Sequence, residues 1–192
     1  MNQEVFKVLV VDDEPGIRIG ISRVLQSFSV KLDEENLNII FDVDTVETAE
    51  EAIEKIKKSP PQIILLDNKL PGMSGIEALE VITSMKLPET YTIIITAYAS
   101  IESAVKATKY GAYDFLPKPF TPTDLKNTIY KVVKQLIVER KARQLAEEKK
   151  RIRFEFLSVL AHELKAPINA VDGYLKILED MDVTKNPELV KD

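Results

Sequence analysis

The sequence predicts an α/β fold: five parallel strands in one doubly wound sheet, followed by a long α-helix. Five short, β-branched apolar runs occur in roughly the first 120 residues, and turn or polar residues follow each of them. Stretches with helical spacing separate the runs, and this alternation gives a parallel sheet that is covered on both faces. From about Thr121 the pattern becomes one long helical stretch, which a single proline, Pro167, interrupts.

The predicted strands are, in chain order, VFKVLVV (5–11), LNIIFDV (37–43), QIILLD (62–67), YTIIIT (91–96) and AYDFL (112–116). Apolar residues with helical spacing lie between these strands at 17–28, 49–56 and 76–82. In parallel sheets of this kind, binding and catalytic residues collect at the carboxyl ends of the strands. The residues that follow each strand are therefore the candidates for a functional site.

Composition excludes several classes of function. The formal net charge of -5 argues against bulk electrostatic binding to nucleic acid or to an anionic membrane. The absence of cysteine excludes disulfides and thiolate metal sites. No apolar run approaches the ~18 residues of a membrane span, and residues 1–11 do not resemble a signal peptide. These features predict a cytoplasmic protein.

The stretch 139–153 contains seven basic and three acidic residues and has hardly any apolar face. Its residues are strong helix formers without glycine or proline, which predicts a helix, with a flexible linker as the alternative. A single helix over 122–180 would be about 90 Å long at 1.5 Å per residue. One domain does not need such a helix, so the length predicts a partner helix.

Beyond residue 153, apolar residues recur at alternating intervals of three and four, which is a heptad pattern. The members of this seam are Phe154, Leu157, Ala161, Leu164, Ile168, Val171, Leu175 and Leu178. Phe156 and Leu160 widen the seam to the stripe expected in a four-helix bundle. The pattern predicts a homodimer through this helix. His162, the only histidine, directly follows a seam residue and lies beside the seam.

Charged and polar side chains follow four of the five predicted strands. Asp12 and Asp13 follow the first strand, Asp67 ends the third, Thr96 ends the fourth and Lys118 follows the fifth. Three carboxylates that converge cannot all stay ionised without a cation, and hard oxygen ligands favour Mg²⁺. A hydroxyl and an ammonium opposite them suit a phosphoryl group. Each residue alone has an ordinary structural explanation, but the ordered set predicts a site.

Four segments carry a resemblance to a known family: VLVVDDEPGIR, IILLDNKLPGMSGIEAL, IIITAYAS and GAYDFLPKPF. They resemble the bacterial response-regulator receiver domain, over residues 5 to about 122, which has a flavodoxin-like fold. The resemblance implies that Asp67 is the phosphoacceptor and that Asp13 and Asp67 bind Mg²⁺. It also implies that Asp12 assists through water and that the backbone carbonyl of Lys69 is a further ligand.

The same resemblance assigns the remaining residues of the site. Thr96 and Lys118 would contact the phosphoryl group, and Phe115 would be the switch aromatic that turns inward when Thr96 moves. The peptide bond between Lys118 and Pro119 would be cis, which only a bond to proline makes accessible at low cost.

A competing motif is IIFDVDTV (39–46), which fits the pattern of haloacid-dehalogenase phosphatases. In such enzymes the first aspartate, here Asp42, is the nucleophile and the second, Asp44, is the acid. The family also needs a threonine or serine, a lysine and an acidic pair downstream. Thr96 and Lys118 could serve, but no acidic pair follows Lys118 at a strand end. This function is therefore disfavoured.

The segment FLSVLAHELKAPINAV resembles the H-box of sensor histidine kinases, over about 152–180. The resemblance implies that His162 receives phosphate from ATP, that Glu163 is the neighbouring acid or base, and that the helix pairs with its symmetry mate. Pro167 lacks the N–H that would bond the carbonyl of Glu163, so a bend or a loosened turn is expected there.

Together these observations predict a receiver domain at 1–122, a helical linker at 123–153 that continues its last helix, and an incomplete phosphotransfer domain at 154–192. The two resemblances together liken the chain to the N-terminal part of a hybrid histidine kinase. The ATP-binding domain is not in the sequence, so the chain alone would be inactive as a kinase. Expected partners are a second copy, an upstream histidine kinase or phosphotransfer protein, and a downstream response regulator. The alternative is a complete response regulator with a dimerising helical output and no kinase activity.

Overall fold

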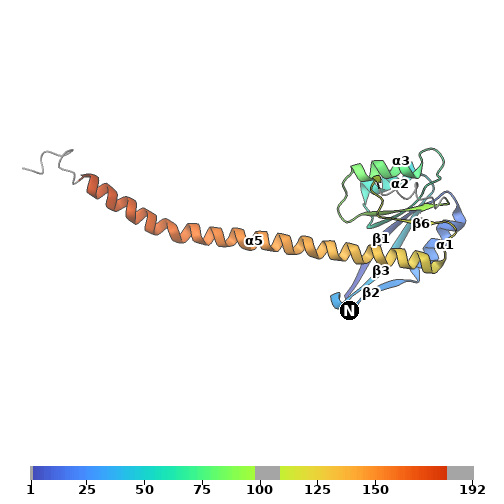
Figure 1. Ribbon diagram of the computed structural model, residues 1–192, viewed down its shortest axis with the longest axis horizontal. Coiled ribbons are helices and arrows are strands. Elements are labelled where there is room, and N and C mark those ends of the chain that lie inside the picture. The colour runs from blue at the N-terminus through green and yellow to red at the C-terminus, as the bar shows by residue number, and fades with distance from the viewer. Residues whose placement is uncertain (1, 98–108, 181–192) are drawn as a thin grey trace, which may run out of the picture. The chain divides into compact units, whose positions relative to one another are not determined.

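The computed structural model describes residues 2–97 and 109–180. The chain divides into two units, Met1–Arg140 and Lys141–Asp192. The first unit contains a six-stranded sheet with the strand order β2-β3-β1-β4-β5-β6, and helices cover both of its faces (Figure 1). The predicted doubly wound α/β architecture with a long C-terminal helix is therefore confirmed.

Five of the strands are parallel and lie where the sequence predicts them: β1 (Asn2–Val11), β3 (Leu37–Val46), β4 (Ile63–Asp67), β5 (Tyr91–Thr96) and β6 (Asp114–Pro117). The predicted number of strands is wrong, because β2 (Ser29–Leu32) adds a sixth strand that runs antiparallel to β3. Its sequence, SVKL, contains only two apolar residues, so the apolar runs that reveal the other strands are missing here. Pairing with the longer β3 defines this strand, after η1 (Asp33–Glu35) and the left-handed Asn36 reverse the chain.

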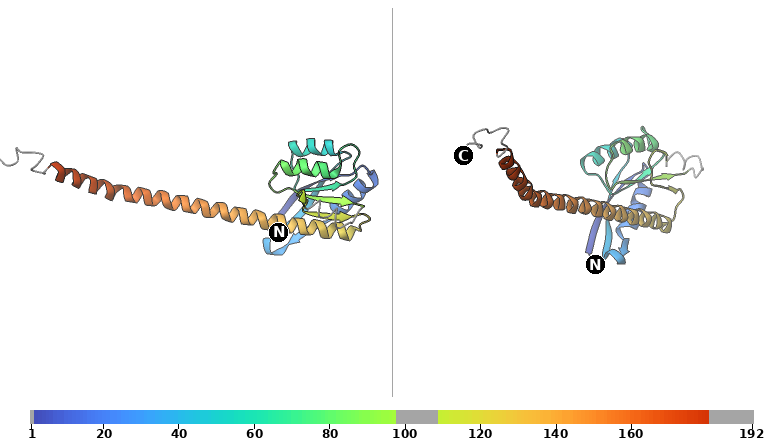
Figure 2. Two further views of the ribbon diagram at one scale, coloured as in Figure 1. Left: turned by 45° about the horizontal axis from the view of Figure 1, so that its top comes forward. Right: turned by 60° about the vertical axis from the view of Figure 1, so that its left-hand side comes forward.

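The sheet is buried on both faces, and each face has its own hydrophobic core. The helices that cover it are α1 (Pro15–Gln26), α2 (Ala49–Lys58), α3 (Gly75–Ser84) and the first part of α5 (Pro122–Asp180). Phe6, Val8 and Val10 of β1 belong to the core under α1 and α5, whereas Leu9 and Val11 belong to the core under α2 and α3. Figure 2 shows these two layers of helices from two further sides. A strand that is apolar on both faces in this way is typical of a parallel sheet.

Local sequence sets the starts of the helices. At α3, Ser74 and Glu77 form a capping box, in which each side chain accepts a hydrogen bond from the backbone N–H of the other residue. Thr48 caps α2 by accepting from the backbone N–H of Glu51, and Pro15 occupies the first turn of α1. These helices therefore begin at fixed residues beside the carboxyl ends of the strands.

Within the first unit, α5 is capped at its start and is tied to β1 and to the loop before β5 at Arg140. Thr121, which precedes α5, and Asp124 in its first turn exchange hydrogen bonds between side chain and backbone. At the last residue of the unit, the guanidinium of Arg140 donates to Glu4 at 2.5 Å and to Glu89 at 2.8 Å. The same guanidinium lies 5.5 Å from the centre of the Phe6 ring. The charged stretch 139–153 is helical, so the flexible linker considered as an alternative is wrong.

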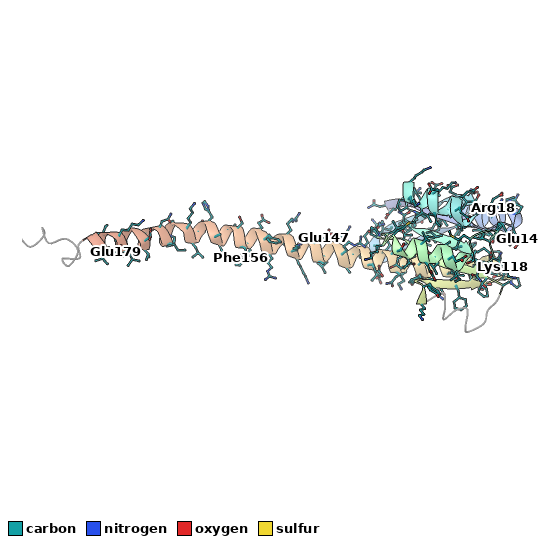
Figure 3. All side chains as sticks on the ribbon, turned by 90° about the horizontal axis from the view of Figure 1, so that it is seen from above. Glu14, Arg18, Lys118, Glu147, Phe156 and Glu179 are labelled. Carbon is teal, nitrogen blue, oxygen red and sulfur yellow. The ribbon has the colours of Figure 1, made fainter. Side chains whose placement is uncertain are left out.

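The second unit contains residues 141–180 of α5, which stay helical through Pro167. The apolar residues of the predicted seam are exposed in this single chain, from 51% for Leu157 to 64% for Leu178. Figure 3 shows the side chains along this helix, with Glu147, Phe156 and Glu179 labelled. Residues 181–192, the last part of the predicted phosphotransfer domain, lie outside the described residues. Across the two described ranges, none of the helices combines the length and the apolar character that crossing a membrane requires.

Candidate functional site

The carboxyl ends of neighbouring strands bring together four of the residues singled out in the sequence. Asp12 directly follows β1, Asp67 ends β4, Thr96 ends β5 and Lys118 directly follows β6. In the sheet register, Asp67 lies opposite Ile95 and therefore next to the end of β5. The parallel topology thus brings residues more than 100 positions apart into one cluster, as the hydrogen bond from Lys118 to Asp12 shows.

Lys118 is the centre of this cluster. Its ammonium Nζ lies 2.9 Å from Oδ2 of Asp12, 2.9 Å from Oδ1 of Asp67 and 3.2 Å from Oε1 of Glu14. Asp12 is fully buried and Asp67 is 4% exposed. Figure 3 shows Glu14 and Lys118 at the same end of the first unit. One cation therefore balances two buried carboxylates, and a third carboxylate approaches it from the surface.

Burial and charge act in opposite directions on the two central groups. Burial raises the pKa of the Asp67 carboxyl above its ordinary value, although the hydrogen bond from Lys118 lowers it. Burial alone would lower the pKa of Lys118, but its hydrogen bonds to Asp67 and Asp12 raise it overall. Lys118 is consequently a fixed positive charge at neutral pH, and Asp67 is a carboxylate with little solvent around it.

The loop after Asp67 holds this carboxylate in place. The backbone N–H of Lys69 donates to Oδ2 of Asp67 at 2.8 Å, and the N–H of Asn68 donates to the carbonyl of Ile95 at 2.9 Å. Gly75, the first residue of α3, lies directly against this loop. A Cβ at Gly75 would be only 2.2 Å from the carbonyl oxygen of Asp67, so only glycine fits there. The sequence analysis did not single out Gly75, because steric contact across a loop leaves no spacing pattern.

The two predicted switch residues lie on adjacent strands. Thr96 is 4% exposed, and its backbone carbonyl accepts a hydrogen bond from the N–H of Lys118 at 2.7 Å. Phe115, on the edge strand β6, is 38% exposed. Its ring therefore lies partly in solvent rather than in the core. The peptide bond between Lys118 and Pro119 is cis, as expected from the resemblance.

The ligand atoms available around Asp67 are carboxylate oxygens, the type of ligand that a hard divalent cation prefers. Asp67 contributes a buried carboxylate, and Asp13 is exposed beside the fully buried Asp12. Among the residues that the structure describes, no three acidic or histidine side chains come close enough to enclose a metal ion. Lys118 instead lies between the carboxylates of Asp12 and Asp67 in this structure.

Arg18 and Glu14 also lie at this site, although they were not predicted from the sequence. Arg18 donates to the backbone carbonyls of Asp12 and Asp13, and Glu14 contacts Lys118. Both residues belong to the segment DDEPGIR, whose composition was noted without roles for these two side chains. Their contacts depend on how α1 leaves the strand, which the sequence pattern does not specify.

The structure does not support the haloacid-dehalogenase motif. Asp42 and Asp44 lie within β3 and are exposed, and Asp44 pairs with Lys55 of α2 at 2.6 Å. Lys118, which that function would require beside them, pairs with Asp12 and Asp67 instead. His162 and Glu163 belong to the second unit, where both side chains are exposed on α5.

Comparison with known proteins gives consistent matches. The family model of the response regulator receiver domain matches residues 8–130. Regulatory protein LuxO of Vibrio cholerae serotype O1 is 37% identical over 94 residues, which are 49% of this chain and 20% of LuxO. Regulatory protein AtoC of Escherichia coli K12 is 34% identical over 149 residues, which are 77% of this chain and 27% of AtoC.

A solved structure of the signal receiver domain of a LuxO repressor protein from Vibrio parahaemolyticus is 33% identical, with a TM-score of 0.61. The match covers 72% of this chain and 98% of that domain. This chain thus spans less than a third of the full regulators LuxO and AtoC.

These comparisons correct one prediction. The predicted histidine kinase activity of a parent protein is wrong, because LuxO and AtoC are named as regulatory proteins and not as kinases. The family match ends at residue 130, so it does not extend to the segment 152–180 that resembles an H-box.

We predict that Gly75→Ala destabilises the fold by about 1 to 3 kcal/mol, because the new methyl group must displace the backbone of Asp67. Gly20→Ala is the matched control, since nothing lies within 4 Å of a Cβ at that helical position. Gly20→Ala should raise stability by about 0.5 to 1 kcal/mol through helix propensity. Urea unfolding measures both variants, and equal stability of the two would contradict the close packing.

We also predict that Lys118→Gln raises the pKa of Asp67 further. The substitution removes the hydrogen bond and the positive charge of Lys118 that lower this pKa, and it leaves burial opposed only by the hydrogen bond from the backbone N–H of Lys69. Titration of the Asp67 carboxyl followed by ¹³C NMR measures the shift. Lys131→Gln is the control, because Lys131 lies on the surface of α5 and pairs only distantly, at 4.0 Å, with Asp114. An unchanged or lower pKa in Lys118→Gln would refute the assignment of causes.

Proposed function

Because the chain belongs to the response regulator receiver domain family, we propose that it is a response regulator in which Asp67 accepts a phosphoryl group and α5 carries the response. One observation carries this proposal: the nearly buried carboxylate of Asp67 lies at a strand end, 2.9 Å from the ammonium of Lys118. The donor would be an upstream histidine kinase or phosphotransfer protein.

The proposed reaction is a direct phosphoryl transfer. A carboxylate oxygen of Asp67 attacks the phosphorus of the donor, an acyl phosphate bond forms, and the bond from phosphorus to the leaving group breaks. Lys118 exchanges its contact with Asp67 for a phosphoryl oxygen, and the hydroxyl of Thr96 donates to another. Asp13, Asp67 and the carbonyl of Lys69 would hold Mg²⁺, with Asp12 assisting, and the bound ion would supply positive charge that neutralises the phosphoryl oxygens.

The switch would then act through the two adjacent strand ends. When Thr96 moves toward the phosphoryl group, it leaves space into which the ring of Phe115 can turn. That ring is 38% exposed in this structure, so burying it would stabilise the phosphorylated state. Phe115 lies on β6, and α5 begins five residues after β6 ends, so α5 is close in the chain to this change.

The proposed output is a helical dimer. Residues 123–153 would act as a linker, and the seam that begins at Phe154 would pair with the same seam of a second copy. The exposed apolar side chains of this seam support the proposal, because a single helix cannot bury them. This is the response regulator with a dimerising helical output that the sequence analysis left as its alternative.

His162 is a second candidate site on the same helix. Its imidazole and the carboxylate of Glu163 are both exposed on α5, beside the apolar seam, so a donor could reach the imidazole. A neutral imidazole nitrogen can attack phosphorus and displace the donor's leaving group, while the other nitrogen is held by a hydrogen bond.

We predict that acetyl phosphate with Mg²⁺ labels the wild-type chain and that Asp67→Ala loses this label. An acyl phosphate on aspartate is lost in alkali, whereas a phosphohistidine survives it. Label that survives alkali and disappears in His162→Gln would therefore identify His162 as an acceptor. Asp67→Ala that takes up as much alkali-labile label as wild type would refute the role of Asp67.

We predict that the chain is a dimer at ~100 μM by light scattering, a concentration suited to micromolar affinities. Leu164→Lys should shift the mass toward a monomer, because it places a charge inside the apolar seam. Glu155→Lys is the control, since Glu155 lies outside the seam on the same helix. A monomeric wild-type chain would refute the helical dimer and leave the receiver function intact.

A further inference from the structure

Arg18 makes contacts that ordinary surface arginines do not make. Its Nη1 donates to the backbone carbonyl of Asp12 at 2.6 Å and to that of Asp13 at 3.1 Å. Its Nη2 donates to Oε1 of Glu47 at 2.5 Å, in the loop between β3 and α2. The side chain of Arg18 is only 12% exposed, whereas that of Glu47 is 66% exposed. The guanidinium is therefore largely enclosed between two loops.

The positive charge of Arg18 interacts unfavourably with the dipole of its own helix, α1. Arg18 lies in the first turn of α1, where the helix dipole disfavours positive charge. The contacts with two carbonyls and one carboxylate offset this effect, so they select one position for the guanidinium. Figure 3 shows Arg18 at the same end of the first unit as Glu14 and Lys118.

The two carbonyls that Arg18 holds belong to the acidic residues of the site. Fixing the carbonyls of Asp12 and Asp13 fixes the peptide planes around Asp13, and these planes set the direction of its carboxylate. From the other side, Oδ2 of Asp12 is held by Lys118, and Oδ1 accepts from the N–H of Glu14 at 2.9 Å. The loop is thus held on the carboxylate side by Lys118 and on the carbonyl side by Arg18.

We propose that Arg18 is a positioning residue that holds the acidic loop after β1 in the conformation that binds Mg²⁺. This role rests on the proposed function, in which Asp13 is a metal ligand. Arg18 does not touch the metal or the phosphoryl group in this role. It acts through the backbone of Asp12 and Asp13, and its link to Glu47 keeps the guanidinium from turning into solvent.

Positioning and charge predict opposite results, which makes the proposal testable. Arg18→Gln removes a positive charge near a cation site, so a purely electrostatic role would tighten Mg²⁺ binding. A positioning role weakens it instead, by about tenfold, the low end of the effect of residues that orient metal ligands. Arg18→Lys keeps the charge but cannot span two carbonyls and a carboxylate, so positioning predicts weaker binding there too.

The experiment is isothermal titration of the full chain with MgCl₂ for wild type, Arg18→Gln and Arg18→Lys. Arg23→Gln is the matched control, because Arg23 is exposed in the last turn of the same helix, and its affinity should equal that of wild type. Circular dichroism melting of each variant checks that it folds. Raised Mg²⁺ concentration should restore the rate at which acetyl phosphate labels both Arg18 variants, since only metal binding is impaired.

The outcomes separate this proposal from the proposed function. If Arg18→Lys binds Mg²⁺ with wild-type affinity and Arg18→Gln binds it more tightly, the positioning role is overturned and Arg18 acts only through its charge. An Arg18→Gln chain that is folded and binds Mg²⁺ like wild type would also overturn it, while labelling of wild-type Asp67 upholds the receiver function. A wild-type chain that neither binds Mg²⁺ nor becomes labelled would overturn both.

Discussion

The contact of one ammonium with two buried carboxylates organises the first unit of this protein. Lys118 can lie 2.9 Å from both Asp12 and Asp67 only if β1, β4 and β6 end at the same level of the sheet. Removing one partner of such a group leaves a buried charge uncompensated, at about 3 to 5 kcal/mol. The same arrangement keeps Asp67 dry and close to a cation, as an acceptor of negatively charged phosphoryl groups needs. The stability of the fold and the proposed phosphoryl transfer therefore both depend on the contact of Lys118 with Asp12 and Asp67.

Close contacts restrict the conformation of the loops around Lys118, Asp12 and Asp67. Gly75 lets α3 approach the carbonyl of Asp67 more closely than any side chain would permit. On the opposite side, Arg18 connects the loop after β1 to Glu47 in the loop after β3. The carboxylate of Asp67 itself is held by the backbone N–H of Lys69 and by the ammonium of Lys118. Preorganisation of this kind limits the reorganisation needed when the phosphoryl group arrives.

The helix α5 has a different environment in each unit. In the first unit, α5 contributes Leu125, Ile129 and Val132 to a buried core. At the end of that unit, Arg140 donates a hydrogen bond to Glu4 near the start of β1. In the second unit its apolar side chains are exposed, and Phe154 is exposed by 63%. The apolar side chains in the first part of α5 are therefore buried within one chain, whereas those in the second part form an exposed apolar surface, which is typical of an interaction site. This difference supports our proposal that α5 carries the response of the receiver.

Five parallel strands, the long helix and the cluster of Asp12, Asp67, Thr96 and Lys118 could be predicted from the sequence alone. Periodicity reports which residues are buried, and parallel topology brings strand ends together whatever the details of the loops. The contacts of Arg18 could not be predicted in this way, because they depend on the geometry of two loops. The strand β2 was also missed, since its sequence SVKL has only two apolar residues and pairing with β3 defines the strand. Local patterns record burial, whereas contacts between segments distant in the chain are fixed only when the chain is folded.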